Sequence, residues 1–233
     1  MKITFRCVPG LESVLLEPFP AGRGLPDWLK EMPLNTFSNA FDQPVETVKK
    51  CPPFIDAMTA GFLMPLACDV QVENGRFSWN WADLPDETPS HTPRTPISMH
   101  ISDQVVDTPL FDDNRLVVKF MNFWTIELEA GFSLLVSHPF NRPDLPFRSL
   151  TGLVNADVYK DNYTHFPAVW TDESFTGVLP KGTPVAQCVP VPRQSMDLVF
   201  EHLEGEAESR LADLQQEIQM DPDTYRRRFR GMD

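Results

Sequence analysis

Proline and glycine interrupt this chain at short intervals and so restrict what it can fold into. Its 233 residues include 23 Pro and 11 Gly. The segments between these breaks are short and apolar, most clearly from residue 115 to residue 193, and they end at Gly, Pro, Asn or Asp. Short apolar runs bounded by turn residues are typical of β-strands. The pattern favours a mainly β core and disfavours a helical bundle.

Length, apolar content and charge set the broad class. A chain of this length fits one β-rich domain with a small appendage, and 42% hydrophobic residues with 17 Phe supply a strongly aromatic core. The formal net charge of −13 argues against general binding to nucleic acid or to an anionic membrane surface. No apolar run approaches the about 20 residues that span a bilayer.

The clearest local signal is a β-hairpin at Asn74-Gly75, between predicted strands at Cys68–Glu73 and Arg76–Trp81. The return strand carries three large aromatics on one face: Phe77, Trp79 and Trp81. We expect this face to pack in the core, with a stacking platform for a ligand as the alternative.

Further strands are expected at Lys2–Val8, Phe62–Leu66, Arg115–Phe120, Trp124–Leu128, Ser133–His138, Leu150–Ala156, Pro167–Trp170, Phe175–Leu179 and Pro184–Pro190. One helical turn is expected at residues 26–30. Pro52 and Pro53 can start a helix of about two turns, and Gly61 can end it.

After Gln194 the composition changes, which predicts a β-rich domain over residues 1–196 and a helical appendage over residues 197–233. Leu198–Met220 has the pattern of a solvated amphipathic helix, and Asp221-Pro222 can begin a last short helix. The appendage could mediate homo-oligomerisation.

The last helix carries four arginines, Arg226, Arg227, Arg228 and Arg230. They predict a phosphate or docking site or, alternatively, pairing with the neighbouring acidic helix.

Polar side chains gather just after the strand predicted at Ser133–His138. His138 could act as a base or metal ligand, while Asn141, Arg142 and Arg148 could clamp a carboxylate or phosphate. The alternative is a proline-fixed turn held by its own hydrogen bonds.

A second polar group contains Asn155, Asp157 and Tyr159, with His165 further on. A metal site would have to draw His138, Asp157 and His165 from separate strands, as cupin-type sites do. No complete metal, P-loop, dinucleotide or Gly-x-Ser-x-Gly motif occurs, so we predict no cofactor.

The four cysteines, Cys7, Cys51, Cys68 and Cys188, form no C-x-x-C pair. We expect free, mostly buried thiols in a reducing cytoplasm, since the chain begins with strand-like alternation and not with a leader. Cys51 precedes a helix start, where a thiol could become a nucleophile, but no His lies nearby in sequence. A buried structural role is therefore expected for Cys51.

Residues 119–124, 131–133, 138–142, 152–159 and 181–187 resemble a family of unknown function that occurs in bacteria and tailed phages. The likeness covers about residues 45–195. It implies a shared fold and carries no mechanism.

Within that stretch, Gly152–Tyr159 and Gly182–Val189 are similar to the last core motifs of dUTPases and dCTP deaminases. Gly182 and Gln187 match the second motif. Gln187, together with Asn155, Asp157 and Tyr159, is therefore a candidate ligand-binding residue. Asn155 stands where a dUTPase has its catalytic Asp, and Asn cannot act as the base that activates water. The resemblance therefore implies the β-clip scaffold without dUTP hydrolysis.

The predicted fold is mainly β: a β-clip-like distorted barrel or sandwich with a C-terminal helical hairpin, or alternatively a cupin-like double-stranded β-helix. Three functions remain open. The first is a small-ligand-binding or assembly protein without dUTPase activity. The second is an enzyme acting on a nucleotide or small anionic metabolite, and the third is a metal-dependent oxygenase-like enzyme.

Overall fold

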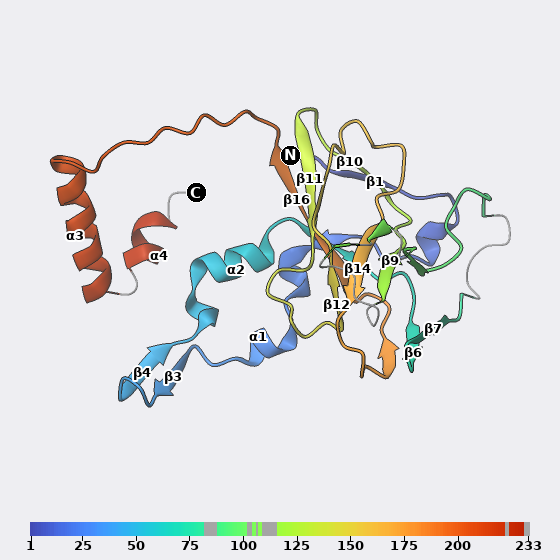
Figure 1. Cartoon of the computed structure of the whole chain (residues 1–233), viewed down its shortest axis with the longest axis horizontal. Coiled ribbons are helices and arrows are strands. Elements are labelled where there is room, and N and C mark those ends of the chain that lie inside the picture. Colours follow the sequence, from blue (N-terminus) through green and yellow to red (C-terminus); the bar gives the residue numbers. More distant parts are fainter. Residues whose placement is uncertain (82–87, 102–103, 106, 109–115, 222–223, 231–233) are drawn as a thin grey trace. The chain divides into compact units, whose positions relative to one another are not determined.

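The computed structural model describes residues 1–81, 88–101, 104–105, 107–108, 116–221 and 224–230 (Figure 1). The chain forms two compact units, Met1–Arg193 and Gln194–Asp233. The described residues contain sixteen strands, all of them in the first unit, and a pair of helices in the second. The predicted class, mainly β with a C-terminal helical pair, is confirmed.

Two antiparallel sheets form most of the first unit. The larger has the order β13-β11-β16-β5-β2, formed by Gly152–Val154, Phe132–Ser137, Pro184–Pro192, Phe62–Pro65 and Phe19–Pro20. The other has the order β12-β14-β9-β8, formed by Phe147–Ser149, Phe166–Trp170, Val117–Phe120 and Ile97–Met99. Within the described residues neither sheet closes on itself, so the architecture is that of a distorted sandwich and not a barrel.

Three smaller sheets complete the unit. They are β15-β6-β7 (Gly177–Leu179, Val70–Glu73, Arg76–Trp79), β1-β10 (Thr4–Arg6, Thr125–Glu127) and β3-β4 (Asn35–Ser38, Gln43–Glu46). Short helices connect the strands: α1 (Asp27–Glu31), α2 (Pro52–Thr59) and 3₁₀ turns at Leu11–Ser13, Ala21–Gly24 and Val48–Lys50. No helix in the described part of the chain is long and apolar enough to cross a membrane.

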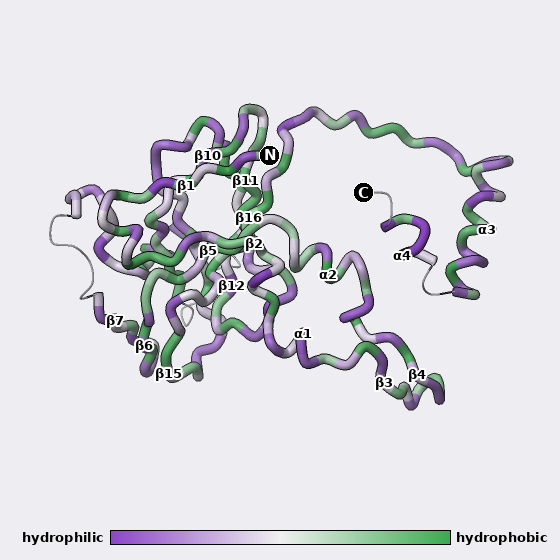
Figure 2. The backbone as a smooth tube through the Cα atoms, turned by 180° about the vertical axis from the view of Figure 1, so that it is seen from behind, coloured by the Kyte–Doolittle hydropathy of each residue, from purple (hydrophilic) through white to green (hydrophobic). Residues whose placement is uncertain are grey.

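One hydrophobic core joins these sheets because alternate strand residues point inward. Val118 and Phe120 of β9, Leu134 of β11 and Phe166 of β14 are at most 1% exposed and belong to a single cluster. In Figure 2 the backbone around β5 and β16 of this unit is largely coloured as hydrophobic. The core therefore lies between the sheets and leaves their connecting turns available for a site.

The predicted hairpin is confirmed: Asn74 and Gly75 have φ values of 50° and 71°, as a tight two-residue turn requires. Its aromatic face packs inward. The ring centroids of Phe77 and Trp170 are 4.9 Å apart in an edge-to-face contact, and those of Trp81 and Phe123 are 5.2 Å apart. The expectation of core packing is thus correct.

Helix α2 begins at the two prolines and ends just before Gly61, as expected. Gly61 has φ +66°, a conformation that glycine adopts without strain. A Cβ atom there would overlap the carbonyl oxygen of Cys188 on β16. Glycine thus allows the end of α2 to lie directly against the central strand of the larger sheet.

Several expected boundaries were wrong or incomplete. The β3–β4 hairpin, β8 and β12 were not predicted, because their residues lack a clear apolar alternation; β3 is almost entirely exposed. Arg115, expected to start a strand, lies outside the described residues, and β9 begins at Val117.

The second unit corrects the predicted helix at Leu198–Met220. Helix α3 spans Glu206–Met220, and residues 194–205 precede it without helical structure. Gly205, with φ 58°, lies at the start of the helix. The last helix, α4, spans Thr224–Phe229, while Pro222, expected at its start, lies outside the described residues. Arg228 pairs with Glu217 of α3 at 2.7 Å and Arg227 pairs with Asp221, the C-cap of α3, at 2.6 Å, as the second alternative expected.

Candidate functional site

The turn between β11 and β12 forms one wall of an open pocket of about 540 Å³. Because β12 pairs with β14, the end of β14 completes the pocket. Its lining residues are His138, Asn141, Arg142, Pro143, Leu145, Phe147, Arg148 and Thr171. The structure thus brings together four of the predicted site residues, His138, Asn141, Arg142 and Arg148.

His138 is held by two backbone groups. Its Nε2 lies 2.9 Å from the carbonyl oxygen of Arg142, and its Nδ1 accepts the N–H of Ser149 at 3.3 Å. Burial lowers the pKa of His138, and the charges of Arg148 and Arg142 lower this pKa further. The ring is therefore neutral with its proton on Nε2, and neither nitrogen is available to act as a base or metal ligand.

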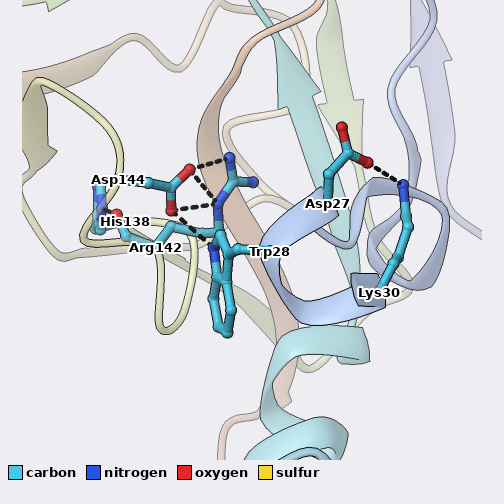
Figure 3. Close-up of polar contacts among 6 residues, drawn as sticks. All are labelled: Asp27, Trp28, Lys30, His138, Arg142 and Asp144. Carbon is cyan, nitrogen blue, oxygen red and sulfur yellow. Dashed lines mark hydrogen bonds and ion pairs between the residues drawn. The ribbon is translucent and has the colours of Figure 1, made fainter. Parts of the chain in front are cut away.

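Arg142 and Asp144 form a bidentate ion pair on one side of the turn (Figure 3). Arg142 Nε donates to Asp144 Oδ1 at 2.9 Å, and Nη2 donates to Oδ2 at 2.8 Å. Trp28 of α1 donates its indole N–H to the same carboxylate at 3.3 Å. Burial acts to raise the pKa of Asp144, but the hydrogen bonds and charge of Arg142, with the hydrogen bond from Trp28, together hold this pKa below its usual range. The charge of Arg142 is thus compensated within the protein, and the turn is tied to α1.

Arg148 differs from Arg142 because no acidic side chain among the described residues compensates its charge. It lies between two buried residues of β12, Phe147 and Ser149, so its side chain points outward into the pocket. Within the described residues it makes no hydrogen bond or ion pair, although the chain carries thirteen more negative than positive charges. A solvated arginine in a concave site is a ready partner for an anion.

The remaining lining residues add polar and apolar groups. Asn141 is exposed, has a left-handed backbone with φ 56° and lines the pocket. Thr171 is exposed at the end of β14, and Phe147 and Leu145 form an apolar wall. The pocket can therefore contact both a charged group and a flat or aliphatic body.

The second predicted group lies elsewhere and holds the backbone. Asp157 accepts the N–H of Gly131 at 3.0 Å and forms an ion pair with Arg193, whose Nη1 is 2.7 Å from Oδ1. This pair, more than the backbone bond, holds the pKa of Asp157 well below its usual range. Asn155 Oδ1 accepts a hydrogen bond from Ser133 at 2.8 Å. Tyr159 is 46% exposed and is not among the residues that line the pocket.

Gln187, expected near a ligand, is 1% exposed and has its side chain fully occupied. Its Nε2 donates to the carbonyls of Ala57 and Ala60 at 2.9 and 2.7 Å, and its Oε1 accepts the N–H of Phe140 at 2.8 Å. It therefore joins the end of α2 to the turn that builds the pocket.

The proposed metal ligands are not brought together. His165 is half-buried and its Nδ1 accepts the N–H of Asn122 at 3.1 Å, while His138 and Asp157 have the separate partners given above. No group of three or more His, Cys, Asp or Glu side chains suited to a metal occurs within the described ranges. The described structure therefore does not bring His138, Asp157 and His165 together as one group of ligands.

The histidines give the fold a defined pH dependence. Burial, aided by Lys119, lowers the pKa of His165 from 6.5 to about 4, and the pKa of His138 is lowered in the same direction. Between pH 6.5 and about pH 4, His165 is protonated in the unfolded chain and neutral in the folded chain. The free energy of unfolding therefore falls as the pH drops from 6.5 towards 4.

We expect His165→Gln to reduce this acid sensitivity by roughly 1 kcal/mol between about pH 7 and about pH 5, after allowance for partial exposure. Urea unfolding of both proteins at the two pH values measures the difference. Equal slopes of stability against pH in wild type and variant would contradict the assignment.

Cys51 corrects the expectation of a buried thiol. It is exposed at the N-cap of α2, whereas Cys188 is buried and Cys7 and Cys68 are half-buried. All four cysteines are free thiols.

Three contributing residues were missed from the sequence. Trp28 reaches Asp144 from 116 positions away, and Thr171 joins the pocket only through the pairing of β12 with β14. Arg193, which forms the ion pair with Asp157, follows an ordinary strand and gave no signal.

No protein-family model matches the chain, and the comparison with curated proteins gives no match.

Proposed function

We propose that this protein binds a small anionic ligand, such as a phosphate- or carboxylate-bearing metabolite or a nucleotide, in the pocket beside β12. The observation that carries the proposal is Arg148, which lines the pocket of a strongly acidic chain and has no counter-ion within the part of the chain that the structure describes. An anion would supply the missing charge, and charge-assisted hydrogen bonds of this kind are the strong ones.

The neighbouring groups fit such a ligand. Asn141 and Thr171 offer neutral donors, and the half-buried Leu145 offers an apolar surface for the body of the ligand. The ion pair of Arg142 with Asp144 and the bonds of His138 hold the turn in place before the ligand arrives. A preorganised site loses less entropy on binding.

Recognition is better supported than catalysis. His138 has both nitrogens engaged, and the other lining residues include no carboxylate or thiol. At the position compared with the dUTPase aspartate, Asn155 is hydrogen-bonded to Ser133. We therefore propose a binding protein on a scaffold related to the β-clip enzymes, without their hydrolytic step. Free thiols at all four cysteines support a cytoplasmic location.

A thermal-shift screen against inorganic phosphate, nucleoside monophosphates and triphosphates, succinate and citrate tests the proposal. A ligand at about 100 times its Kd should add about 2.7 kcal/mol of stability. We expect Arg148→Gln to weaken binding of that ligand by at least about tenfold, because one charge-assisted contact is lost.

Arg76→Gln is the matched control, since Arg76 is an exposed arginine on β7 that does not line the pocket. It should leave the affinity unchanged. Absence of a shift with every probe, or equal affinities of Arg148→Gln and wild type, would refute the proposal.

A second role, self-association through residues 197–233, is favoured by one specific observation. The second unit buries no hydrophobic side chain among its described residues, and it exposes Met196, Leu198, Val199 and Phe200 by 74% or more. Figure 2 shows this hydrophobic stretch ahead of α3. A unit without its own core is stabilised when another surface covers it.

A further inference from the structure

Helix α3 carries an apolar stripe with the spacing of a coiled-coil seam. Ala207, Leu211, Leu214 and Ile218 follow one another at intervals of four, three and four residues, which correspond to heptad positions d, a, d and a. Leu211 and Ile218 remain 44% and 36% exposed even though α4 lies beside α3. No residue of α3 is buried.

The helix needs a partner to be stable. It has 15 residues, and isolated helices of about this length are marginal in water. Its stripe offers four apolar layers to another helix of the same kind. Every copy of the chain carries the same stripe, so a second copy of α3 can be this partner.

The stripe matches itself in the antiparallel direction. When two copies run antiparallel with Leu211 opposite Leu214 of the second copy, Ala207 falls opposite Ile218 of that copy. Each layer then combines an a residue with a d residue, as antiparallel helix pairs require. One register therefore buries all four apolar residues of both helices.

Flanking charges favour the same arrangement. Arg210 and Glu217 occupy the g positions beside the stripe. Their side chains are 70% and 43% exposed, although Arg210 pairs with Glu206 and Glu217 pairs with Arg228 within the same chain. In the antiparallel register, Arg210 of each copy lies beside Glu217 of the other, so two opposite-charge pairs form. In a parallel pair Arg210 would instead meet Gln215, which offers no charge.

We propose that two copies of this chain associate through an antiparallel α3–α3 seam in this register. The inference rests on the proposed association through residues 197–233 and specifies its geometry. The seam is a symmetric interface, in which the same residues of both copies make the same contacts.

Sedimentation velocity of the full chain between about 1 and about 200 μM tests the association, because dimerisation follows mass action. We expect a concentration-dependent dimer. Leu211→Glu should weaken it at least about 100-fold, since two carboxylates then enter the seam. Ala212→Glu adds the same charge at a position outside the seam and should leave the dimer intact. Near-UV circular dichroism should show an unchanged β-rich unit in both variants.

Charge reversal tests the register. In the Arg210→Glu dimer each of the two contacts joins two glutamates, and in the Glu217→Arg dimer each contact joins two arginines. Each variant alone should therefore dimerise roughly tenfold more weakly than wild type. An equimolar mixture of the two variants restores both opposite-charge pairs and should recover the lost affinity.

The outcomes separate the two proposals. A wild-type monomer across the whole concentration range overturns both the association and the seam. A dimer that withstands Leu211→Glu retains the association and overturns the seam. A dimer that Leu211→Glu disrupts, but that the mixture of charge variants does not restore, overturns the antiparallel register.

Discussion

Replacement of Gln187 by Leu is expected to lower the free energy of unfolding by about 3–5 kcal/mol, one of the largest effects of any single substitution in this chain. The side chain is buried and makes three hydrogen bonds to backbone groups. Leucine fills the volume but leaves the N–H of Phe140 and two carbonyls at the end of α2 without this partner. Urea unfolding followed by tryptophan fluorescence measures the loss.

Gln71→Leu is the control, because Gln71 is exposed on β6 and should change stability by less than about 0.5 kcal/mol. Gln187→Glu should be at least as damaging as Gln187→Leu near neutral pH, since a carboxylate would face two carbonyl oxygens. Stability within about 1 kcal/mol of wild type in both Gln187 variants would contradict the bridging role.

Gly61→Ala is expected to destabilise the protein by about 3 kcal/mol or more. The substitution incurs two costs. A left-handed backbone is unfavourable for alanine by about 1–2 kcal/mol. The new methyl group would also overlap the carbonyl oxygen of Cys188, with Val189 Cα only 3.1 Å away, so α2 must shift from β16. The midpoint of urea unfolding measures the sum of both costs.

Two other glycines separate these costs. Gly131 has φ +87° and open space around it, so Gly131→Ala carries only the backbone cost. Gly152 has neither a left-handed backbone nor a close neighbour, and Gly152→Ala should be nearly neutral. Equal effects of Gly61→Ala and Gly131→Ala would mean that the close approach to β16 contributes nothing.

Much of the fold was predictable because its strands carry strong local signals. The hairpin at Asn74-Gly75 and the helix between Pro52 and Gly61 depend on backbone preferences of single residues. The β3–β4 hairpin was not predictable in this way, since its residues are mostly exposed and its pairing is not reflected in an apolar pattern. The helix expected from Leu198 begins eight residues later, because the residues before Gly205 share its composition but not its structure.

The candidate site was predictable only in part. A cluster of polar residues after β11 marked the turn correctly, since side chains at a strand end point to the rim. Their roles were not visible, because Arg142 and Arg148 look alike in sequence and only the fold gives one of them an acidic partner. Asp157 and Gln187 looked equally suited to a ligand, yet both satisfy backbone groups from distant segments.

The ion pair of Arg193 with Asp157 also determines how the β-rich unit would respond to mechanical load. Arg193 is the last residue of that unit, and it holds the carbonyl of Phe132 as well as Asp157. Tension along the C-terminal segment would enter at this residue and run along β16, which is paired with β11 on one side and β5 on the other. Inter-strand hydrogen bonds lie perpendicular to the strands, so a pull along β16 would shear them together instead of opening them one at a time. The chain thus leaves its β-rich unit at a mechanically resistant point.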